Sequence, residues 1–300
     1  MNKNVKADFV LVLVTMAWGL SYLLIDLSLE EMGNFTLNAL RFGGAFLCIS
    51  IFAFPKLKHI SKATFRYSAL IGIILLGVYT TATYGVQYTS ISNSGFLISL
   101  TVLFTPIFSF FIKKQVLEKK IFLVCIACTA GVALMTLDEN FRIAPGDMIC
   151  LLCAVLNSLY LITVEIAVRK EDVDAFQCAV LPMGFMGVYC TILAFLLEEP
   201  TLPQSTTVWA SVIFLSLVCT GFALIAQSIV QKYTDASHVG VIYTLEPVFA
   251  SFIAMVWAGE VLMPRAYLGE AIMICSMIIM EIDLKRWLPA KIGFRSKIKI

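Results

Sequence analysis

Long apolar stretches, separated by short polar or charged connections, follow one another along the whole chain. In a stretch such as 68–83, apolar residues continue without the strict alternation of a membrane β-strand, so the pattern predicts helices. Because a helix needs about 20 apolar residues to cross a bilayer, we expect ten transmembrane helices. The predicted spans are 8–29, 35–54, 66–88, 93–112, 120–137, 146–167, 175–197, 207–231, 236–258 and 264–284.

The composition excludes a soluble globular protein. Hydrophobic residues make up 60% of the 300 residues, charged residues only 14%, and the mean hydropathy is +0.90, whereas soluble domains carry roughly 25% charged residues. Ten spans leave no room for a separate catalytic or nucleic-acid-binding domain. The first apolar stretch lacks a small-residue cleavage site, so we expect it to be a retained span and not a signal peptide.

Positive charges alternate between the connections. Of the 22 lysines and arginines, 19 fall before the first span, in even-numbered connections or in the tail 285–300. The odd-numbered connections hold only Arg142 and Arg265, and Arg41 lies in the second span. By the positive-inside rule, we expect a multi-pass protein of the cytoplasmic membrane with both termini in the cytoplasm. The basic tail would then lie on the anionic inner leaflet.

Two segments of the chain resemble one another. Each begins with a Tyr-Thr pair, at Tyr88 and at Tyr233, passes through small residues and reaches a proline, Pro106 or Pro247. The two copies are five spans apart, and because five is odd they cross the membrane in opposite directions, as in the inverted repeats of secondary transporters. We expect a first repeat at 1–142, a second at 143–284 and a basic cytoplasmic tail at 285–300.

Several short motifs occur in order at the ends of the expected spans. They are Trp18-Gly19, Leu40-Arg41-Phe42, Tyr88-Thr89-Ser90, Phe104-Thr105-Pro106, Leu245-Glu246-Pro247 and Gly259-Glu260. Together they resemble the drug/metabolite transporter superfamily, and specifically its ten-helix EamA-domain family. The resemblance implies two inverted five-helix repeats around a central cavity and the movement of small metabolites or drugs, often outward. It does not identify a substrate.

Glu246 is the strongest candidate for a functional residue. It lies near the middle of the ninth span, where a carboxylate costs a few kcal/mol or more. Pro247 has no N–H to donate to the carbonyl of Tyr243, and the spacing places Tyr243 and Glu246 on one helix face. We therefore expect this face to line the cavity. The alternative is a protonated Glu246 that only packs the bundle; its expected counterpart in the first copy is Thr105.

Further polar side chains share helix faces inside the expected spans. With Glu246, the expected substrate-binding residues are Tyr84, Gln87, Asn157, Tyr160, Gln227 and Tyr243. Such polar stripes also join transmembrane helices to one another, so a purely structural role stays open. Expected gating or hinge residues are Trp18, Tyr22, Asp26, Pro106 and Pro247. For Asp26, a structural pair with Arg41 is the alternative that we favour.

The sequence contains no phosphate-binding loop and no HExxH or GxSxG motif, so we expect neither an enzyme nor a bound cofactor. Two CxxC pairs are interpreted as small apolar residues and not as a metal site. We expect a secondary transporter that exports small polar or zwitterionic metabolites, amino-acid-like or amine, by alternating access. We expect it to interact with a small-molecule substrate and the lipid bilayer, and not with nucleic acid. Coupling to a proton and the oligomeric state stay open.

No lysine or arginine is expected at the centre of the cavity, which argues against polyanions as substrates. The remaining alternatives are an uncoupled facilitator, a drug efflux protein, a lipid-headgroup flippase and a membrane enzyme.

Overall fold

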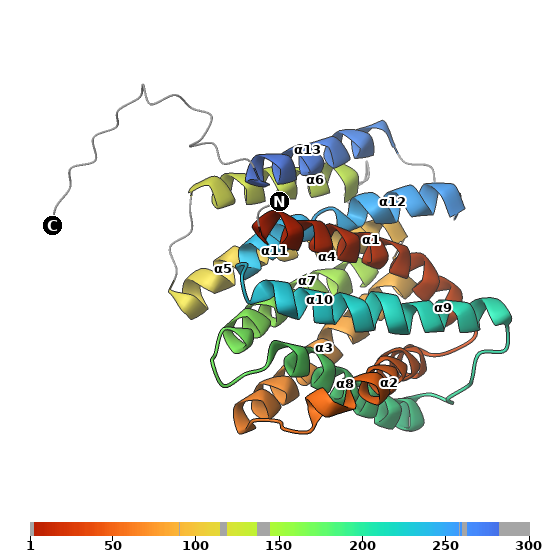
Figure 1. The fold of residues 1–300 in the computed structure, drawn as a ribbon. Coiled ribbons are helices and arrows are strands. Elements are labelled where there is room, and N and C mark those ends of the chain that lie inside the picture. The colour runs from red at the N-terminus through yellow and green to blue at the C-terminus, as the bar shows by residue number, and fades with distance from the viewer. Residues whose placement is uncertain are drawn as a thin grey trace.

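The computed structural model describes residues 3–89, 91–114, 119–136, 145–257, 259 and 263–281, and this part of the chain is helical without strands (Figure 1). The first half contains α1 (Lys3–Leu29), α2 (Asn34–Ala53), η1 (Phe54–Leu57), α3 (Lys62–Tyr88), α4 (Ile91–Ser99), α5 (Thr101–Lys113) and α6 (Lys119–Thr136). The second contains α7 (Pro145–Val168), α8 (Ala175–Leu197), α9 (Thr206–Ser216), η2 (Leu217–Phe222), α10 (Ala223–Gln231), α11 (Ala236–Tyr243), α12 (Glu246–Trp257) and α13 (Pro264–Glu281).

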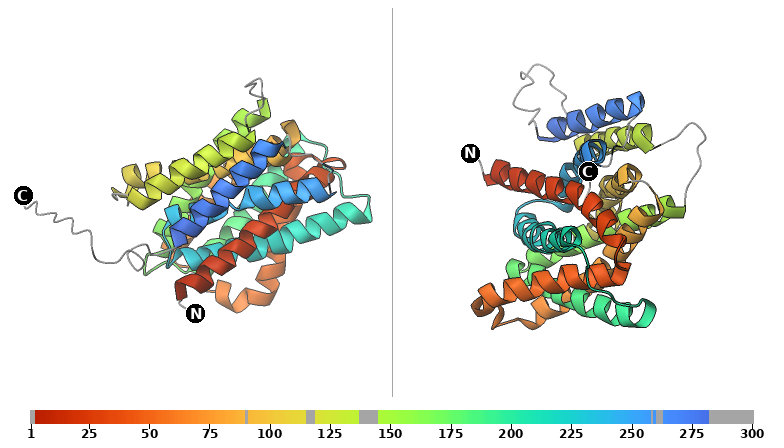
Figure 2. Two further views of the ribbon diagram at one scale, coloured as in Figure 1. Left: turned by 90° about the horizontal axis from the view of Figure 1, so that it is seen from above. Right: turned by 90° about the vertical axis from the view of Figure 1, so that its right-hand side faces the viewer.

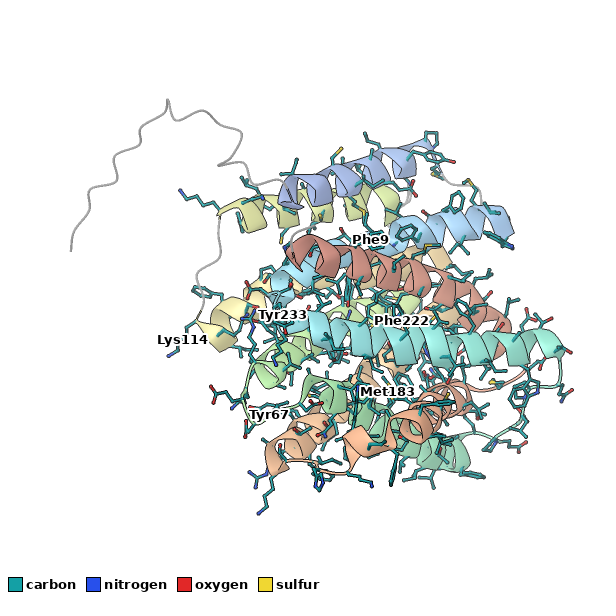
Figure 3. The ribbon with its side chains drawn as sticks, viewed as in Figure 1. Phe9, Tyr67, Lys114, Met183, Phe222 and Tyr233 are labelled. Carbon is teal, nitrogen blue, oxygen red and sulfur yellow. The ribbon has the colours of Figure 1, made fainter. Side chains whose placement is uncertain are left out.

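The predicted all-helical membrane fold is confirmed. Within the described residues, eight helical segments are long and apolar enough to cross a bilayer, and α6 and α13 contain the shorter apolar helices Phe122–Gly131 and Tyr267–Ser276. Large apolar side chains cover the outside of the bundle, for example Phe9 and Phe222, whereas Met183 is fully buried (Figure 3). A membrane-spanning bundle needs such an apolar outer surface, because the hydrocarbon of the bilayer surrounds it in place of water.

The contacts between helices repeat when the two halves are exchanged. Helix α3 packs on α7, as α9 and α10 pack on α1; α5 contacts α7, as α12 contacts α1; and α4 contacts α12, as α11 contacts α5. Helices α2 and α8 are counterparts that pack on each other, and so are α6 and α13. Figures 1 and 2 show these two pairs on opposite sides of the bundle. The fold therefore has an approximate internal two-fold symmetry.

The seam between α2 and α8 is tied at both ends. At one end the carboxylate of Glu198 accepts hydrogen bonds from the backbone N–H groups of Phe35 (2.8 Å) and Thr36 (2.9 Å). At the other end Gln177 Nε2 donates to the carbonyl of Lys56 at 2.7 Å. We call this second end, where α1 begins and α5 ends, the basic end, because Lys56, Lys113 and Lys170 lie there, and the other the opposite end.

The fourth span of each half is broken near its middle. In the second half the break separates α11 from α12: Thr244 and Leu245 form tight turn hydrogen bonds, and Pro247 lies in the first turn of α12, where its missing N–H is tolerated. In the first half, α4 and α5 are separated at Leu100. Such interruptions are typical of helices that line binding sites in transporters.

The two breaks do not coincide with the two prolines. Counted from Tyr88 and Tyr233, Thr101 at the start of α5 takes the place of Glu246 at the start of α12. The expectation that Thr105 is the counterpart of Glu246 is therefore wrong, because the extra helical turn of the first copy lies between the break and Pro106. The carbonyl of Val102, which Pro106 deprives of its helical donor, accepts a hydrogen bond from the Cys125 thiol at 3.3 Å.

Candidate functional site

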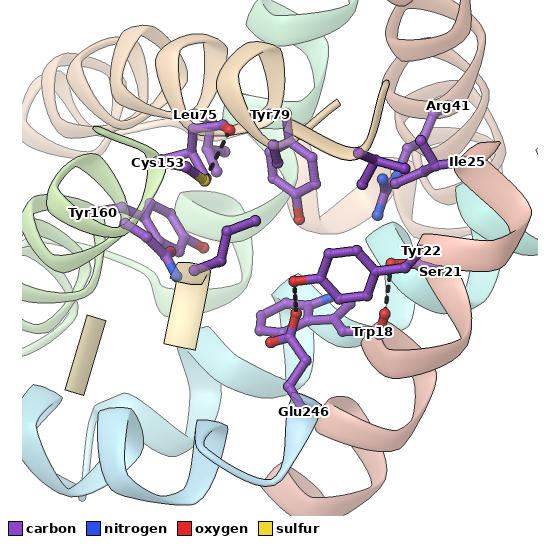
Figure 4. Close-up of a pocket in the computed structure, with 15 residues that line it drawn as sticks. Trp18, Ser21, Tyr22, Ile25, Arg41, Leu75, Tyr79, Cys153, Tyr160 and Glu246 are labelled. Carbon is purple, nitrogen blue, oxygen red and sulfur yellow. Dashed lines mark hydrogen bonds between the residues drawn. The ribbon is translucent and has the colours of Figure 1, made fainter. Parts of the chain in front are cut away.

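A cavity of about 60 Å³ lies between the halves, and side chains from both halves line it (Figure 4). Since a buried water needs at least 10–15 Å³ of such volume, the cavity has room for roughly four waters. Its lining runs from the middle of α1, α3 and α7 toward the opposite end of the bundle. The lining residues are Trp18, Ser21, Tyr22, Ile25, Arg41, Leu75, Val78, Tyr79, Ala82, Val86, Ile98, Cys153, Asn157, Tyr160 and Glu246.

Glu246 faces this cavity from the first position of α12. The hydroxyl of Tyr22 donates a hydrogen bond of 2.6 Å to its Oε1, which is the short distance typical of a bond to an ionised acceptor. Glu246 is half-buried, whereas Tyr22 is 4% exposed. A carboxylate at a helix N-terminus also interacts favourably with the helix dipole. Tyr22 and the start of α12 therefore hold the carboxylate in place, with Tyr22 bonded to one of its two oxygens.

Trp18 forms the neighbouring wall and is held by the π-helix η2. A π-helix has wider turns than an α-helix, with i→i+5 hydrogen bonds, and such turns are frequent at functional sites. Here the carbonyl of Cys219 accepts a hydrogen bond from Trp18 Nε1 at 2.7 Å. The Trp18 ring also meets the ring of Tyr243 edge-on, with 4.9 Å between centroids. This places α1 against both η2 and α11 beside the cavity.

Arg41 lines the same cavity, although its position in the sequence does not predict this. Its side chain is 1% exposed; Nε donates to Thr220 Oγ1 at 2.6 Å, and Nη2 lies 3.5 Å from the carbonyl oxygen of Cys219. The guanidinium lies 4.7 Å from the ring centroid of Tyr79. No lysine or arginine was expected at the centre of the cavity, and Arg41 nevertheless belongs to its lining. Arg41 is buried against η2, whereas Asp26, its expected partner, is exposed.

The other expected binding residues lie at three different places. Asn157 and Tyr160 line the cavity with Glu246. Tyr243 and Gln227 are buried behind it, Tyr243 against Trp18 and Gln227 hydrogen-bonded to Gln231. Tyr84 and Gln87 lie outside the lining: Tyr84 packs against the rings of Phe35 and Tyr88, and Gln87 is exposed.

The expected gating residues are also divided. Trp18 and Tyr22 belong to the cavity wall, and Asp26 follows them on α1 toward the opposite end. Pro247 lies at the helix break beside Glu246, whereas Pro106 is buried inside α5, away from the corresponding break. A role in gating stays a prediction for all five residues.

The comparisons with known proteins agree with this architecture. Residues 5–137 and 144–282 each match the model of the EamA-like transporter family. The chain belongs to this family. As an EamA-like family member it is a multi-pass membrane protein, and the family and the names of its relatives indicate a transporter of small molecules rather than an enzyme.

Several relatives match over nearly their whole length. An "Uncharacterized transporter" of Archaeoglobus fulgidus is 29% identical over 93% of this chain and 87% of its own. A "Probable terminal-alkyne amino-acid exporter" of Streptantibioticus cattleyicolor is 21% identical over 92% of this chain and 93% of its own. A protein of known crystal structure, 18% identical, superposes with a TM-score of 0.75 over 94% of this chain and 99% of its own, which shows the shared fold.

The side of the EamA cavity toward the basic end is closed by buried polar residues. Gln227 Nε2 donates to Gln231 Oε1 at 3.0 Å, and Gln231 Nε2 donates to the carbonyl of Leu161 at 3.1 Å. All three side chains are fully buried. This layer separates the cavity from the basic end.

A charged cluster around Glu165 lies beyond that layer. The Glu165 side chain is 1% exposed and receives Lys113 Nζ at 2.8 Å, Arg169 Nη1 at 2.8 Å and the backbone N–H of Ala236 at 2.8 Å. Lys113 belongs to the first half, and Glu165, Arg169 and Ala236 to the second. The sequence pattern does not reveal this cluster, because Lys113 and Ala236 are brought to Glu165 only by the tertiary fold.

Another polar contact between the halves lies at the same end. His238 Nε2 of α11 is 3.1 Å from Asp8 Oδ1 of α1. The Lys113–Glu165 bridge and the His238–Asp8 contact therefore add to the Gln177–Lys56 hydrogen bond among the polar contacts that connect the halves at the basic end. The cavity lies on the other side of the buried glutamine layer.

Proposed function

We propose that this protein is a secondary transporter that exports small zwitterionic or amine metabolites across the cytoplasmic membrane by alternating access. Glu246 binds the substrate's ammonium group or a proton in exchange for it. The observation that carries the proposal is the position of Glu246: a half-buried carboxylate in a cavity between two symmetric halves, at a helix break in a membrane-spanning bundle. Intramembrane acids in such cavities mark substrate or proton pathways.

The one-sided closure of the cavity supports alternating access. The glutamine layer and the Lys113–Glu165 bridge close the basic end, and the lining extends toward the opposite end. Because the halves are related by approximate symmetry, exchanging their conformations would close the opposite end and open the basic end. With the basic end in the cytoplasm, as the distribution of lysines and arginines favours, this structure is the state that faces outward.

The lining supports a small, partly aromatic substrate. Trp18, Tyr22, Tyr79 and Tyr160 surround Glu246, and aromatic faces attract ammonium groups. Room for about four waters suits a molecule of a few heavy atoms in this state. The relative named as a probable amino-acid exporter supports amino-acid-like cargo and the outward direction.

The proposal is tested by counterflow in proteoliposomes, with amino acids, small amines and nucleosides as candidate substrates, each with and without a proton gradient. We expect an amino acid or amine to be exchanged by the wild type and Glu246→Gln to reduce its exchange at least tenfold. Glu270→Gln is the matched control, because Glu270 is also intramembrane but bonds Ser251 outside the cavity.

Unchanged counterflow in Glu246→Gln would remove Glu246 from the mechanism. An exchange rate that does not change with a proton gradient of either direction would favour the uncoupled facilitator over a proton-coupled exporter. Exchange of nucleosides alone would contradict the proposed substrate class.

A further inference from the structure

We infer that Arg41 is the anchor for a substrate carboxylate, so that Arg41 and Glu246 form a two-pole site selective for small α-amino acids over amines and over carboxylic acids. This inference deepens the proposed function and rests on it. Arg41 thereby receives a role that the resemblance to the EamA family does not imply.

Arg41 forms no direct ion pair with an anionic side chain among the described residues. A buried cation within a membrane bundle is expensive and normally pairs with an anion. The partners of Arg41 are neutral: the Thr220 hydroxyl, the Cys219 carbonyl and the Tyr79 ring. Among the described residues, no salt bridge within 4.0 Å involves Arg41. Only two of its five N–H donors have protein acceptors there.

The two opposite charges of the cavity, on Glu246 and Arg41, are held apart. Glu246 and Arg41 line one cavity, yet each is bonded to its own side: Glu246 to Tyr22 on α1, and Arg41 to Thr220 in η2. Figure 4 shows the polar ends of Tyr79, Tyr22 and Arg41 directed into the space above Glu246. The cavity is therefore preorganised with a negative and a positive pole, and no direct ion pair cancels them.

One class of small molecule matches both poles of the cavity. An α-amino acid carries an ammonium and a carboxylate on the same carbon, and it would place the first at Glu246 and the second at the free edge of the Arg41 guanidinium. An amine would leave Arg41 without an anion, and a carboxylate would leave Glu246 without a cation. Specificity arises because a ligand that lacks one group leaves a buried charge unpaired.

The size of the cavity narrows the class further. Volume for about four waters suits an amino acid with a side chain of alanine or serine size in this state. Ethylamine and propionate are matched probes, because each is alanine without one of its charged groups.

The test is a titration of purified protein in nanodiscs with alanine, ethylamine and propionate at neutral pH, followed by tryptophan fluorescence, since Trp18 lines the cavity. In the wild type we expect alanine to bind at least tenfold more tightly than either probe. Arg41→Gln should abolish the advantage of alanine over ethylamine, and Arg41→Lys, which keeps the charge, should retain part of it. Trp18→Phe identifies the signal that comes from the cavity.

Equal binding of alanine and ethylamine by the wild type would overturn the inference, and so would an unchanged ratio in Arg41→Gln. Should Arg41→Gln fail to fold, the Arg41→Lys ratio decides: a value between one and the wild-type ratio supports the anchor, and the full wild-type ratio contradicts it. Alanine counterflow that is lost in Glu246→Gln but unchanged in Arg41→Gln and in Arg41→Lys would refute the anchor and leave the proposed function intact. Unchanged counterflow of alanine and of ethylamine in Glu246→Gln would refute both the anchor and the proposed function.

Discussion

Replacing Lys113 with methionine should open the basic end of the bundle. Methionine keeps most of the length of the side chain and removes only its charge, so the Lys113–Glu165 bridge between the halves is lost. Glu165 keeps Arg169 and the N–H of Ala236, and therefore no buried carboxylate is left without partners. The expected effect is a shift of the equilibrium between the two states and not the unfolding of the protein.

The size of the effect follows from the burial of the bridge. Lys113 is 14% exposed and Glu165 1% exposed, so the bridge lies between surface pairs, worth about 0.2–1 kcal/mol, and fully buried ones, whose disruption costs about 3–5 kcal/mol. Roughly 1–3 kcal/mol lost from the closed state raises the ratio of open to closed molecules about 5- to 150-fold.

The assay is electron–electron double resonance between spin labels at Ile112 and Tyr233, both exposed, on α5 and just before α11. We expect a longer-distance population in Lys113→Met. Arg169→Met is the matched control, because Arg169 bonds Glu165 and Asp235 within the second half and its loss leaves the bridge between the halves in place. An equal shift in both variants, or none in Lys113→Met, would refute the assignment of this bridge as a gate.

Two further predictions concern packing and pH. Gly19→Val should lower the melting temperature in a thermal unfolding scan, because a Cβ there lies 2.6 Å from Phe249 Cβ, whereas Gly43→Ala, with nothing within 4 Å of its Cβ, should not. Hydrogen bonds from Ser205 and Gln204 lower the pKa of Glu31, so they stabilise this connection above about pH 4.3 and are lost as the pH falls through the lowered pKa. Glu31→Gln should therefore speed amide exchange at Ser205 near pH 7, with a difference from the wild type that narrows toward low pH.

The sequence was sufficient for the helices and for the acidic residue of the site. Apolar length determines where a chain crosses a bilayer, and the cost of a carboxylate in hydrocarbon singles out Glu246 without knowledge of its neighbours. The repeat predicted two related halves, and the symmetric helix contacts agree with it.

What the sequence could not provide is the contact each side chain makes across helices. Arg41 was expected to pair with Asp26, because residue count gives the depth of a side chain along a helix but not the neighbour it faces. The π-helix that binds Arg41 has no counterpart in the continuous α3. Tyr84 and Gln87 share a face with other polar residues, yet they lie toward the opposite end and outside the cavity lining. In each case the tertiary packing decides.

Contact between the Glu246 carboxylate and the transported molecule can be measured by infrared difference spectroscopy. Spectra of the reconstituted protein are recorded before and after addition of the compound that counterflow exchanges most strongly. We expect a carboxyl band that changes on binding in the wild type and in Glu270→Gln and is missing in Glu246→Gln. Saturating binding with no change in any carboxyl band, or an identical change in Glu246→Gln, would show that the transported molecule does not contact Glu246.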